Sequence, residues 1–368
     1  MAAKAFQTSG PITDFDKTVY IERNEDKEVL NYIRGGKHVT ILGARQTGKT
    51  SLLYNIERQL GEGYIPIYID LSAGDSIKDE REWYQQFLCE RILAQVSDRF
   101  TSDVGKQKLV PAESKIGFFN FINQVALGVK PSDRIVMMLD EFGTVPEFLN
   151  DNFFGAIRTV TVERTIDRKG FEKWIFVLAG STEPGELISL QSKNSPFNIT
   201  QRIYMSDFDK EGTRQVVENL KAHGIQLEKG EELINRIHEQ TGGHPFLVQV
   251  ICDRLKNSDT ISIDSVNQAI NGLTVPQRIY DELNKDKEAS QLVIRILGGG
   301  KEFFDRSKIK AKLTLLGVIK RGKDGNCIIH NPIYEKALIA RLREVLQDIA
   351  APSEGWMEAI RKRLRQLF

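Results

Sequence analysis

The feature that most constrains this chain is a glycine-rich segment, Gly43-Ala44-Arg45-Gln46-Thr47-Gly48-Lys49-Thr50, which fits the pattern GxxxxGK[ST] at every fixed position. The apolar run His38–Gly43 leads into it and predicts a buried strand, and helical spacing follows over Lys49–Leu60. Glycines let the backbone N–H groups of such a turn point inward at an anion, and the positive end of the following helix faces the same place. The segment therefore predicts a loop, extending to Ser51, that binds the phosphates of ATP or ADP. Lys49 would contact the β- and γ-phosphates, and Thr50 would bind Mg²⁺.

A second motif, Ile135–Glu141 (IVMMLDE), lies about 90 residues after the first. Its apolar residues predict a buried strand that ends at Asp140, where the carboxylate can hold Mg²⁺ through water. Glu141, the next residue, is placed where a carboxylate can orient and polarise the attacking water. The two motifs together predict ATP hydrolysis with Lys49 and Glu141 as catalytic residues, and a metal site formed by Thr50 and Asp140.

The rest of the first half alternates between strand and helix patterns. Further buried strands are predicted at Tyr64–Leu71, Trp174–Gly180 and Arg202–Phe208, with helices at Glu80–Val96 and Phe153–Arg164. Strands that alternate with helices are typical of an α/β fold in which helices cover both faces of a parallel sheet.

The strand pattern stops after Asp209. Helical stretches then predict a small helical lid: Lys210–His223, Glu231–Gln240, Pro245–Lys256 and Ile263–Asn271. Two helices, two short runs joined by a turn (Gly317–Lys320 and Cys327–His330) and a helix from Pro332 follow, in the order of a winged helix. We therefore expect five parts: an extended lead-in (1–18), a nucleotide-binding domain (19–208), a lid (209–273), a winged helix (274–350) and an amphipathic tail helix (351–368).

Composition indicates the cellular compartment and the possible partners. The three cysteines are scattered, no apolar span of membrane length occurs, and the first residues lack the apolar stretch of a signal peptide, so we expect a cytoplasmic protein. The net charge of +1 hides an asymmetry: residues 274–368 contain 19 Lys and Arg against 12 Asp and Glu. This basic third can attract nucleic acid or an acidic partner, and it can equally be a solvated face.

On these residues the chain resembles the signal-transduction ATPases with numerous domains (the STAND class), in particular their bacterial AAA-like group. The resemblance covers roughly residues 18–345 and rests on these motifs: YIER (20–23), GARQTGKTSLL (43–53), MMLDE (137–141), LAGSTE (178–183), SPFN (195–198) and TGGHP (241–245). It implies a nucleotide-binding domain, a helical lid and a winged helix that close over ADP. Exchange for ATP would open the molecule and permit assembly.

The resemblance also implies roles for single residues. Arg23 would flank the adenine, Ser181 and Thr182 would sense the γ-phosphate, His244 and Pro245 of the lid would touch the base, and His330 would bond the β-phosphate of ADP. Each has an ordinary alternative: a solvated arginine, a polar turn after a strand, a proline in the first turn of a helix, a structural histidine. Some relatives have Asp where Asn331 stands here.

Two functions are compatible with the sequence. In the first, slow ATP hydrolysis controls self-association or the release of a separate effector protein; in the second, an initiator-like ATPase grips duplex DNA through its basic winged helix. Arg158 and Arg164 are candidates for an arginine finger supplied to a neighbouring subunit. The tail residues Glu354–Phe368 predict an amphipathic helix that packs within the chain, meets a partner or meets an anionic membrane. Relatives often carry a sensor or effector beyond this point, which we expect here to be a separate protein or to be missing from a shortened chain.

Overall fold

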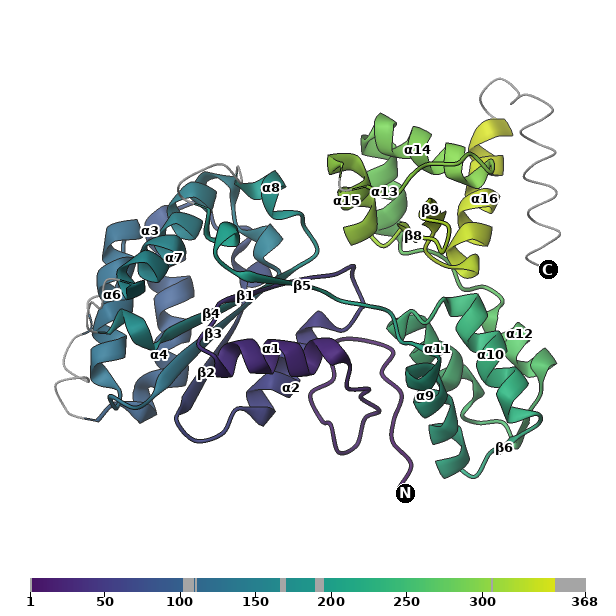
Figure 1. Ribbon diagram of the computed structural model, residues 1–368, viewed down its shortest axis with the longest axis horizontal. Coiled ribbons are helices and arrows are strands. Elements are labelled where there is room, and N and C mark those ends of the chain that lie inside the picture. The colour runs from purple at the N-terminus through teal and green to yellow at the C-terminus, as the bar shows by residue number, and fades with distance from the viewer. Residues whose placement is uncertain are drawn as a thin grey trace. The chain divides into compact units, whose positions relative to one another are not determined.

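The computed structural model describes residues 2–101, 109, 111–165, 170–188, 195–305 and 307–347 (Figure 1). The predicted tail helix lies outside these residues. The chain divides into two compact units, which we describe separately. The first unit comprises residues 1–22, 43–48 and 206–368, and the second comprises residues 23–42 and 49–205. In the described part of the chain, no helix is both long enough and apolar enough to cross a membrane.

The second unit is built on a parallel sheet of five strands in the order β2-β3-β4-β1-β5. The strands are β1 (Val39–Leu42), β2 (Tyr64–Asp70), β3 (Arg134–Asp140), β4 (Trp174–Gly180) and β5 (Gln201–Tyr204). Strands β1, β3 and β4 are buried almost throughout, as expected of parallel strands covered on both faces. Because all strands run the same way, the segments that follow β1, β3 and β4 emerge at one edge of the sheet. The predicted α/β fold with a parallel sheet is confirmed.

Helices cover both faces of this sheet (Figure 1). On one face, α1 (Asn24–Arg34) and α2 (Lys49–Gln59) pack Val29, Ile33, Leu52 and Ile56 against the strands. The other helices of this unit are α3 (Glu80–Glu82), a π-helical turn (Trp83–Cys89), α4 (Glu90–Val96), α6 (Lys115–Gly128), α7 (Asn150–Thr165) and α8 (Pro184–Leu187). An aromatic cluster joins three of them, since the ring of Phe153 lies 4.8 Å from Trp83 and 6.3 Å from Phe118.

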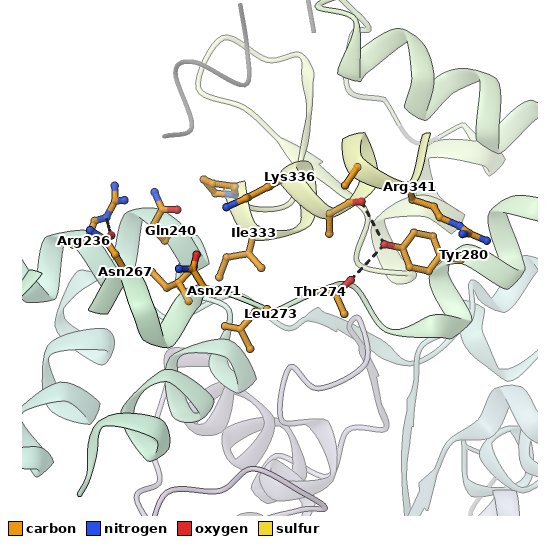
Figure 2. A pocket seen from close by; sticks show the side chains of 15 residues that line it. Arg236, Gln240, Asn267, Asn271, Leu273, Thr274, Tyr280, Ile333, Lys336 and Arg341 are labelled. Carbon is orange, nitrogen blue, oxygen red and sulfur yellow. Dashed lines mark hydrogen bonds between the residues drawn. The ribbon is translucent and has the colours of Figure 1, made fainter. Parts of the chain in front are cut away.

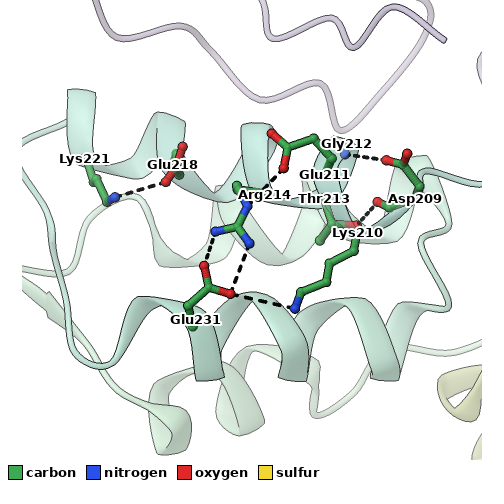
Figure 3. Close-up of polar contacts among 9 residues, drawn as sticks. All are labelled: Asp209, Lys210, Glu211, Gly212, Thr213, Arg214, Glu218, Lys221 and Glu231. Carbon is green, nitrogen blue, oxygen red and sulfur yellow. Dashed lines mark hydrogen bonds and ion pairs between the residues drawn. The ribbon is translucent and has the colours of Figure 1, made fainter.

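The first unit begins with the chain's N-terminal segment and continues with four helices, α9 (Lys210–Ala222), α10 (Gly230–Thr241), α11 (Pro245–Leu255) and α12 (Ile263–Ile270). Two short strands, β6 (Gln226–Leu227) and β7 (Thr260–Ile261), pair in parallel beside them. Asp209 caps α9 by accepting from the backbone N–H of Gly212 (2.7 Å), and Glu231 of α10 pairs with Lys210 and Arg214 of α9 (Figure 3). Such exposed ion pairs are worth little singly, so the shared apolar core holds these helices together.

The remainder of the first unit comprises α13 (Gln277–Lys285), α14 (Lys287–Leu297), α15 (Lys308–Leu315), the antiparallel strands β8 (Ile319–Arg321) and β9 (Cys327–Ile329), and α16 (Pro332–Gln347). Phe303 pairs with Asn326 beside β9, which adds a third extended segment to the hairpin. This order of elements is compatible with the predicted winged helix, which stays a prediction.

Several local expectations need correction. The predicted helix Glu80–Val96 contains a π-helical turn at Trp83–Cys89, where the aromatic side chains enter the core. Helix α6 was not predicted, because its apolar residues surround the helix without a clear stripe. The lead-in has no helix over residues 2–18, and it packs on the first unit: Phe6 belongs to that unit's core, together with Val19 and Ile21, which follow the lead-in.

Candidate nucleotide-binding site

The glycine-rich segment forms the turn between β1 and α2 with the backbone that its pattern requires. Gln46 and Gly48 have positive φ values of 63° and 91°, and the hydroxyl of Thr47 donates to the carbonyl oxygen of Ala44 at 2.7 Å. A non-glycine residue at positive φ is uncommon and costs of order 1 kcal/mol or more. Gly43, Ala44, Arg45 and Ser51 complete the predicted loop, whose role in phosphate binding remains a prediction.

Two side chains at the start of α2 reach across the edge of the sheet. Lys49, which is buried, donates from Nζ to Oγ of Ser181 at 2.7 Å, and Ser181 follows β4 directly. Thr50 donates from Oγ1 to Oδ2 of Asp140 at 2.6 Å. The strand order explains both contacts, because β4 lies between β1 and β3. Three segments far apart in the sequence are thereby brought together at this edge.

Asp140 is held by three donors. Besides Thr50, the phenol of Tyr68 donates to Oδ2 at 3.1 Å, and the backbone N–H of Glu141 donates to Oδ1 at 2.9 Å. Burial raises the pKa of the Asp140 carboxyl, and the nearby charge of Glu141 adds to this effect, whereas the Thr50 hydrogen bond and the charge of Lys49 oppose it. Burial and the charge of Asp140 also raise the pKa of Tyr68, so its hydroxyl remains a donor at neutral pH.

Glu141 adopts a left-handed backbone conformation with φ 49° and ψ 46°. Its carbonyl oxygen accepts from the backbone N–H and the hydroxyl of Thr144, at 2.9 and 2.8 Å. Among the described residues no hydrogen bond to its half-buried carboxylate is found, so that group stays available to a water. A conformation of this cost at the end of a buried strand is typical of functional positions.

Thr182 packs against the turn that follows Glu141. A Cβ built on Gly143 would lie 2.2 Å from Oγ1 of Thr182, so this position must be glycine to let the two segments approach. Thr182 thus supports the acidic turn, while its neighbour Ser181 contacts Lys49. The structure places both residues at the predicted edge, and their role as γ-phosphate sensors is still a prediction.

The donor set fits Mg²⁺ bound together with a nucleotide. Thr50 and Asp140 offer a hydroxyl and a carboxylate oxygen 2.6 Å apart, and hard oxygen ligands are those that Mg²⁺ prefers. The described residues contain no group of three or more His, Cys, Asp and Glu that could hold a metal alone. This agrees with a site in which phosphate oxygens and water complete the coordination.

The predicted arginines lie in different settings. Arg23 immediately precedes α1, where its backbone N–H donates to Asp26 at 2.9 Å. Arg158 donates to the carbonyl oxygen of Ser195 at 3.2 Å, within SPFN. Arg164 lies half-buried against Gly36, just before the start of β1 and therefore at the edge of the sheet away from Lys49. The role of Arg158 or Arg164 as an arginine finger for a neighbouring subunit stays a prediction.

The other predicted nucleotide contacts, His244, Pro245 and His330, lie together in the first unit. Asp207 accepts from Lys320 at 3.1 Å, and Nε2 of His330 lies 3.0 Å from both of its carboxylate oxygens. Burial alone would raise the pKa of Asp207, but the hydrogen bond and charge of His330, together with Lys320, outweigh it and hold that pKa below its usual range. The His330 ring is 5.4 Å from that of His244, which precedes Pro245 at the start of α11.

Both histidines are almost fully buried, and Nδ1 of each has no hydrogen-bond partner among the described residues. Burial lowers the pKa of His244 to about 3. Gly243 has φ 79°, and a Cβ there would lie 2.0 Å from the carbonyl oxygen of Phe208, so only glycine fits. Packing against Phe208 therefore requires the glycine of the predicted Gly243-His244-Pro245 motif, and this requirement does not depend on a ligand.

Sequence reasoning missed three residues of these clusters: Tyr68, Asp207 and Lys320. Tyr68 is one of several polar residues in β2, and nothing in its pattern shows that its hydroxyl would reach β3. Asp207 and Lys320 are joined only by the fold, 113 positions apart. Asp207 carried a weak signal, because it is a charged residue near the end of the predicted strand Arg202–Phe208.

Comparison with known proteins agrees with the fold. The structure resembles a Walker-type ATPase of Pyrococcus abyssi (TM-score 0.61, 16% identity, 89% of this chain and 98% of that chain). It also resembles the ORC2 protein of Aeropyrum pernix (TM-score 0.54, 12% identity, 90% and 95%). At these identities the likeness shows the fold alone.

In sequence, the chain is 24% identical over 347 residues to an uncharacterized WD repeat-containing protein of Synechocystis sp.. That match covers 86% of this chain and 28% of the relative's length. Residues 8–338 match the model of the AAA-like domain family. The chain therefore belongs to the AAA-like domain family.

Proposed function

We propose that this chain is an ATPase that binds Mg·ATP at the glycine-rich loop and hydrolyses it slowly. The observation that carries the proposal is the pair of contacts Lys49–Ser181 and Thr50–Asp140, which assemble a phosphate-facing cation and a metal-facing hydroxyl and carboxylate at one edge of the sheet. Family membership and the shared fold of the Pyrococcus ATPase support it.

Each residue has a defined part in this proposal. Lys49 would exchange Ser181 for phosphate oxygens, and Thr50 would turn from Asp140 to the metal, which Asp140 would hold through water. Glu141 would orient the attacking water, since its carboxylate is half-buried and makes no hydrogen bond with the described residues. When bound, Mg²⁺ would neutralise the charge that develops on the phosphates.

We further propose that nucleotide state controls self-association or release of a separate effector, as the resemblance to STAND-class ATPases implies. The Asp207–Lys320–His330 cluster supports this, because it joins the segment after β5 to the C-terminal hairpin through contacts that a change of state can break. Nε2 of His330 contacts Asp207, and its Nδ1, which has no hydrogen-bond partner among the described residues, would contact an ADP phosphate. The three buried, unpaired cysteine thiols are in keeping with a reducing compartment such as the cytoplasm.

Two observations favour a second function. The C-terminal third of the sequence is basic, and the chain shares its fold with the Aeropyrum ORC2 protein. An initiator-like ATPase would use those charges on duplex DNA, and its affinity would fall steeply with salt. Equal shifts of a random duplex at 50 and 200 mM salt would argue against this role.

Nucleotide binding and exchange test the proposal. Lys49→Ala should weaken binding of a fluorescent ATP analogue at least tenfold, about 1.4 kcal/mol. His330→Ala should speed ADP release and increase the oligomer seen by light scattering with ATP, roughly tenfold or more, because it removes a contact made in one state only. Unchanged ATP affinity in Lys49→Ala would contradict the site, and an unchanged ADP off-rate in folded His330→Ala would contradict the switch.

A further inference from the structure

One cavity in the described part of the chain does not involve the glycine-rich loop. It has a volume of about 610 Å³ and lies within the first unit, between α10 and α12 on one side and α13 and α16 on the other (Figure 2). The linker 271–274, which joins the two groups of helices, forms its floor. Cavities of 300–1,000 Å³ are of the size that small-molecule ligands occupy.

The charge of the cavity is its most informative property. Among the described residues, its lining contains three cationic side chains, Arg236, Lys336 and Arg341, and no Asp or Glu. Three like charges around one cavity create a positive potential that an anion relieves.

The cations are spread along the cavity rather than gathered at one point. In Figure 2, Arg236 and Arg341 lie toward opposite ends, and Lys336 lies between them. Nε of Arg236 donates to Oδ1 of Asn267 at 2.9 Å, which orients the guanidinium and leaves its terminal nitrogens without a hydrogen bond among the described residues. A ligand that satisfies this arrangement carries negative charge at both ends.

The rest of the lining suits an organic body between two charged ends. The side chains of Ile333 and Leu273 provide apolar surface, and the amides of Gln240 and Asn271 provide donors and acceptors for hydroxyl or ring groups. Arg254 holds the start of the linker in place, because its Nη1 donates to the carbonyl oxygens of Ala269 (2.7 Å) and Asn271 (3.1 Å). The cavity therefore has a shape that exists before a ligand arrives.

We propose that this cavity binds a small organic anion with two phosphate groups, independently of the nucleotide at the glycine-rich loop. Phosphate esters supply close to two charges each at neutral pH and accept bidentate hydrogen bonds from arginine. Such a ligand bridges α10 to α16. Helices α10 and α16 also contact each other directly. In addition, Nζ of Lys320 in β8 donates to the carbonyl oxygen of Gly242, the residue that follows α10, at 3.2 Å. Occupancy of the cavity thus stabilises the arrangement that contains the Asp207 cluster.

Isothermal titration calorimetry with fructose 1,6-bisphosphate as the probe tests this proposal. The full chain is compared with the double variant Arg236→Gln/Lys336→Gln and with a matched control, Arg321→Gln/Lys323→Gln, which removes the same charge outside the cavity. We expect saturable 1:1 binding that the cavity variant weakens at least tenfold and the control changes by less than twofold. The same binding in Lys49→Ala would establish independence from the glycine-rich loop.

Four results would overturn the proposal: no saturable binding of the bisphosphate to folded wild-type protein, equal weakening by both double variants, loss of binding in Lys49→Ala alone, or preference for a hexaglutamate peptide over the bisphosphate. The last result would assign the cavity to an acidic protein segment. Circular dichroism and the thermal midpoint without probe show that each variant is folded. The probe should raise the midpoint of the wild type and of the control, but not that of the cavity variant.

Discussion

Replacement of Tyr68 by Phe tests whether the metal-binding carboxylate depends on a residue that the motifs do not contain. The change removes only the hydroxyl that donates to Asp140 at 3.1 Å. The ring and its contact with Tyr54, at a centroid distance of 4.9 Å, are retained. Any effect on metal use therefore reports on the hydrogen bond rather than on packing.

The size of the effect follows from the setting of the two groups. Hydrogen bonds to charged groups contribute about 1.5–3 kcal/mol, and Tyr68 is only half-buried, so water can replace part of the loss. We expect the lower end, about 1.5 kcal/mol, which corresponds to a roughly tenfold higher Mg²⁺ concentration for half-maximal turnover. The pKa of Asp140 is already raised by burial, and loss of a donor raises it further. The acid limb of the pH–rate profile should therefore move to higher pH.

The assay is ATP turnover as a function of Mg²⁺ concentration and of pH, with nucleotide affinity measured separately in the absence of metal. Tyr54→Phe is the matched control, because it alters the same aromatic pair without touching Asp140. We expect Tyr68→Phe to change metal dependence while affinity for metal-free nucleotide stays within about twofold. Equal metal dependence in Tyr68→Phe and Tyr54→Phe would refute the reasoning.

Two further predictions concern stability. Gly243→Ala should lower the free energy of unfolding by at least about 2 kcal/mol in denaturant titrations, because its Cβ would meet the Phe208 carbonyl oxygen at 2.0 Å. Gly224→Ala has a similar φ of 82° and nothing within 4 Å, so it should cost only about 1 kcal/mol, and equal costs would count against the packing argument. Burial lowers the pKa of His38 and of His244 to about 3 in the folded chain, whereas both have a pKa of about 6.5 in the unfolded chain. The unfolded chain therefore binds protons that the folded chain does not, and the free energy of unfolding falls as the pH drops from 6.5 toward 3. Each histidine should lower the free energy of unfolding by about 1.4 kcal/mol at pH 5.5 relative to pH 7.5. Equal free energies of unfolding in denaturant titrations at the two pH values would contradict this.

Much of the nucleotide-binding unit could be predicted because its strands are short apolar runs that end in chemically distinctive residues. Buried parallel strands need no alternation, so β1, β3 and β4 read as continuous hydrophobic runs. The glycine-rich loop and the Asp140–Glu141 pair follow two of these runs directly, and parallel strands bring their ends to one edge. In this unit, the residue pattern of each strand and the order of the strands in the sheet therefore lead to the same site.

The remainder depends on contacts that no local pattern encodes. Tyr68 reaches Asp140 only because β2 and β3 are neighbours in register, with Tyr68 opposite Met138. Asp207 meets Lys320 through the packing of segments that are distant in sequence. The apolar residues of α6 are buried among aromatic side chains from α7 and the π-helical turn, so a helix without a clear stripe gave no signal.

The central claim, that this chain hydrolyses ATP with Glu141 as the base, is tested most directly by comparing wild type with Glu141→Gln. Glutamine keeps the shape of the side chain but loses the charge that polarises water. We predict Mg²⁺-dependent release of phosphate by the wild type, and turnover about a hundredfold slower in Glu141→Gln, with ATP affinity unchanged. Undiminished turnover in Glu141→Gln, or no Mg²⁺-dependent turnover by folded wild-type protein that binds ATP, would contradict the account.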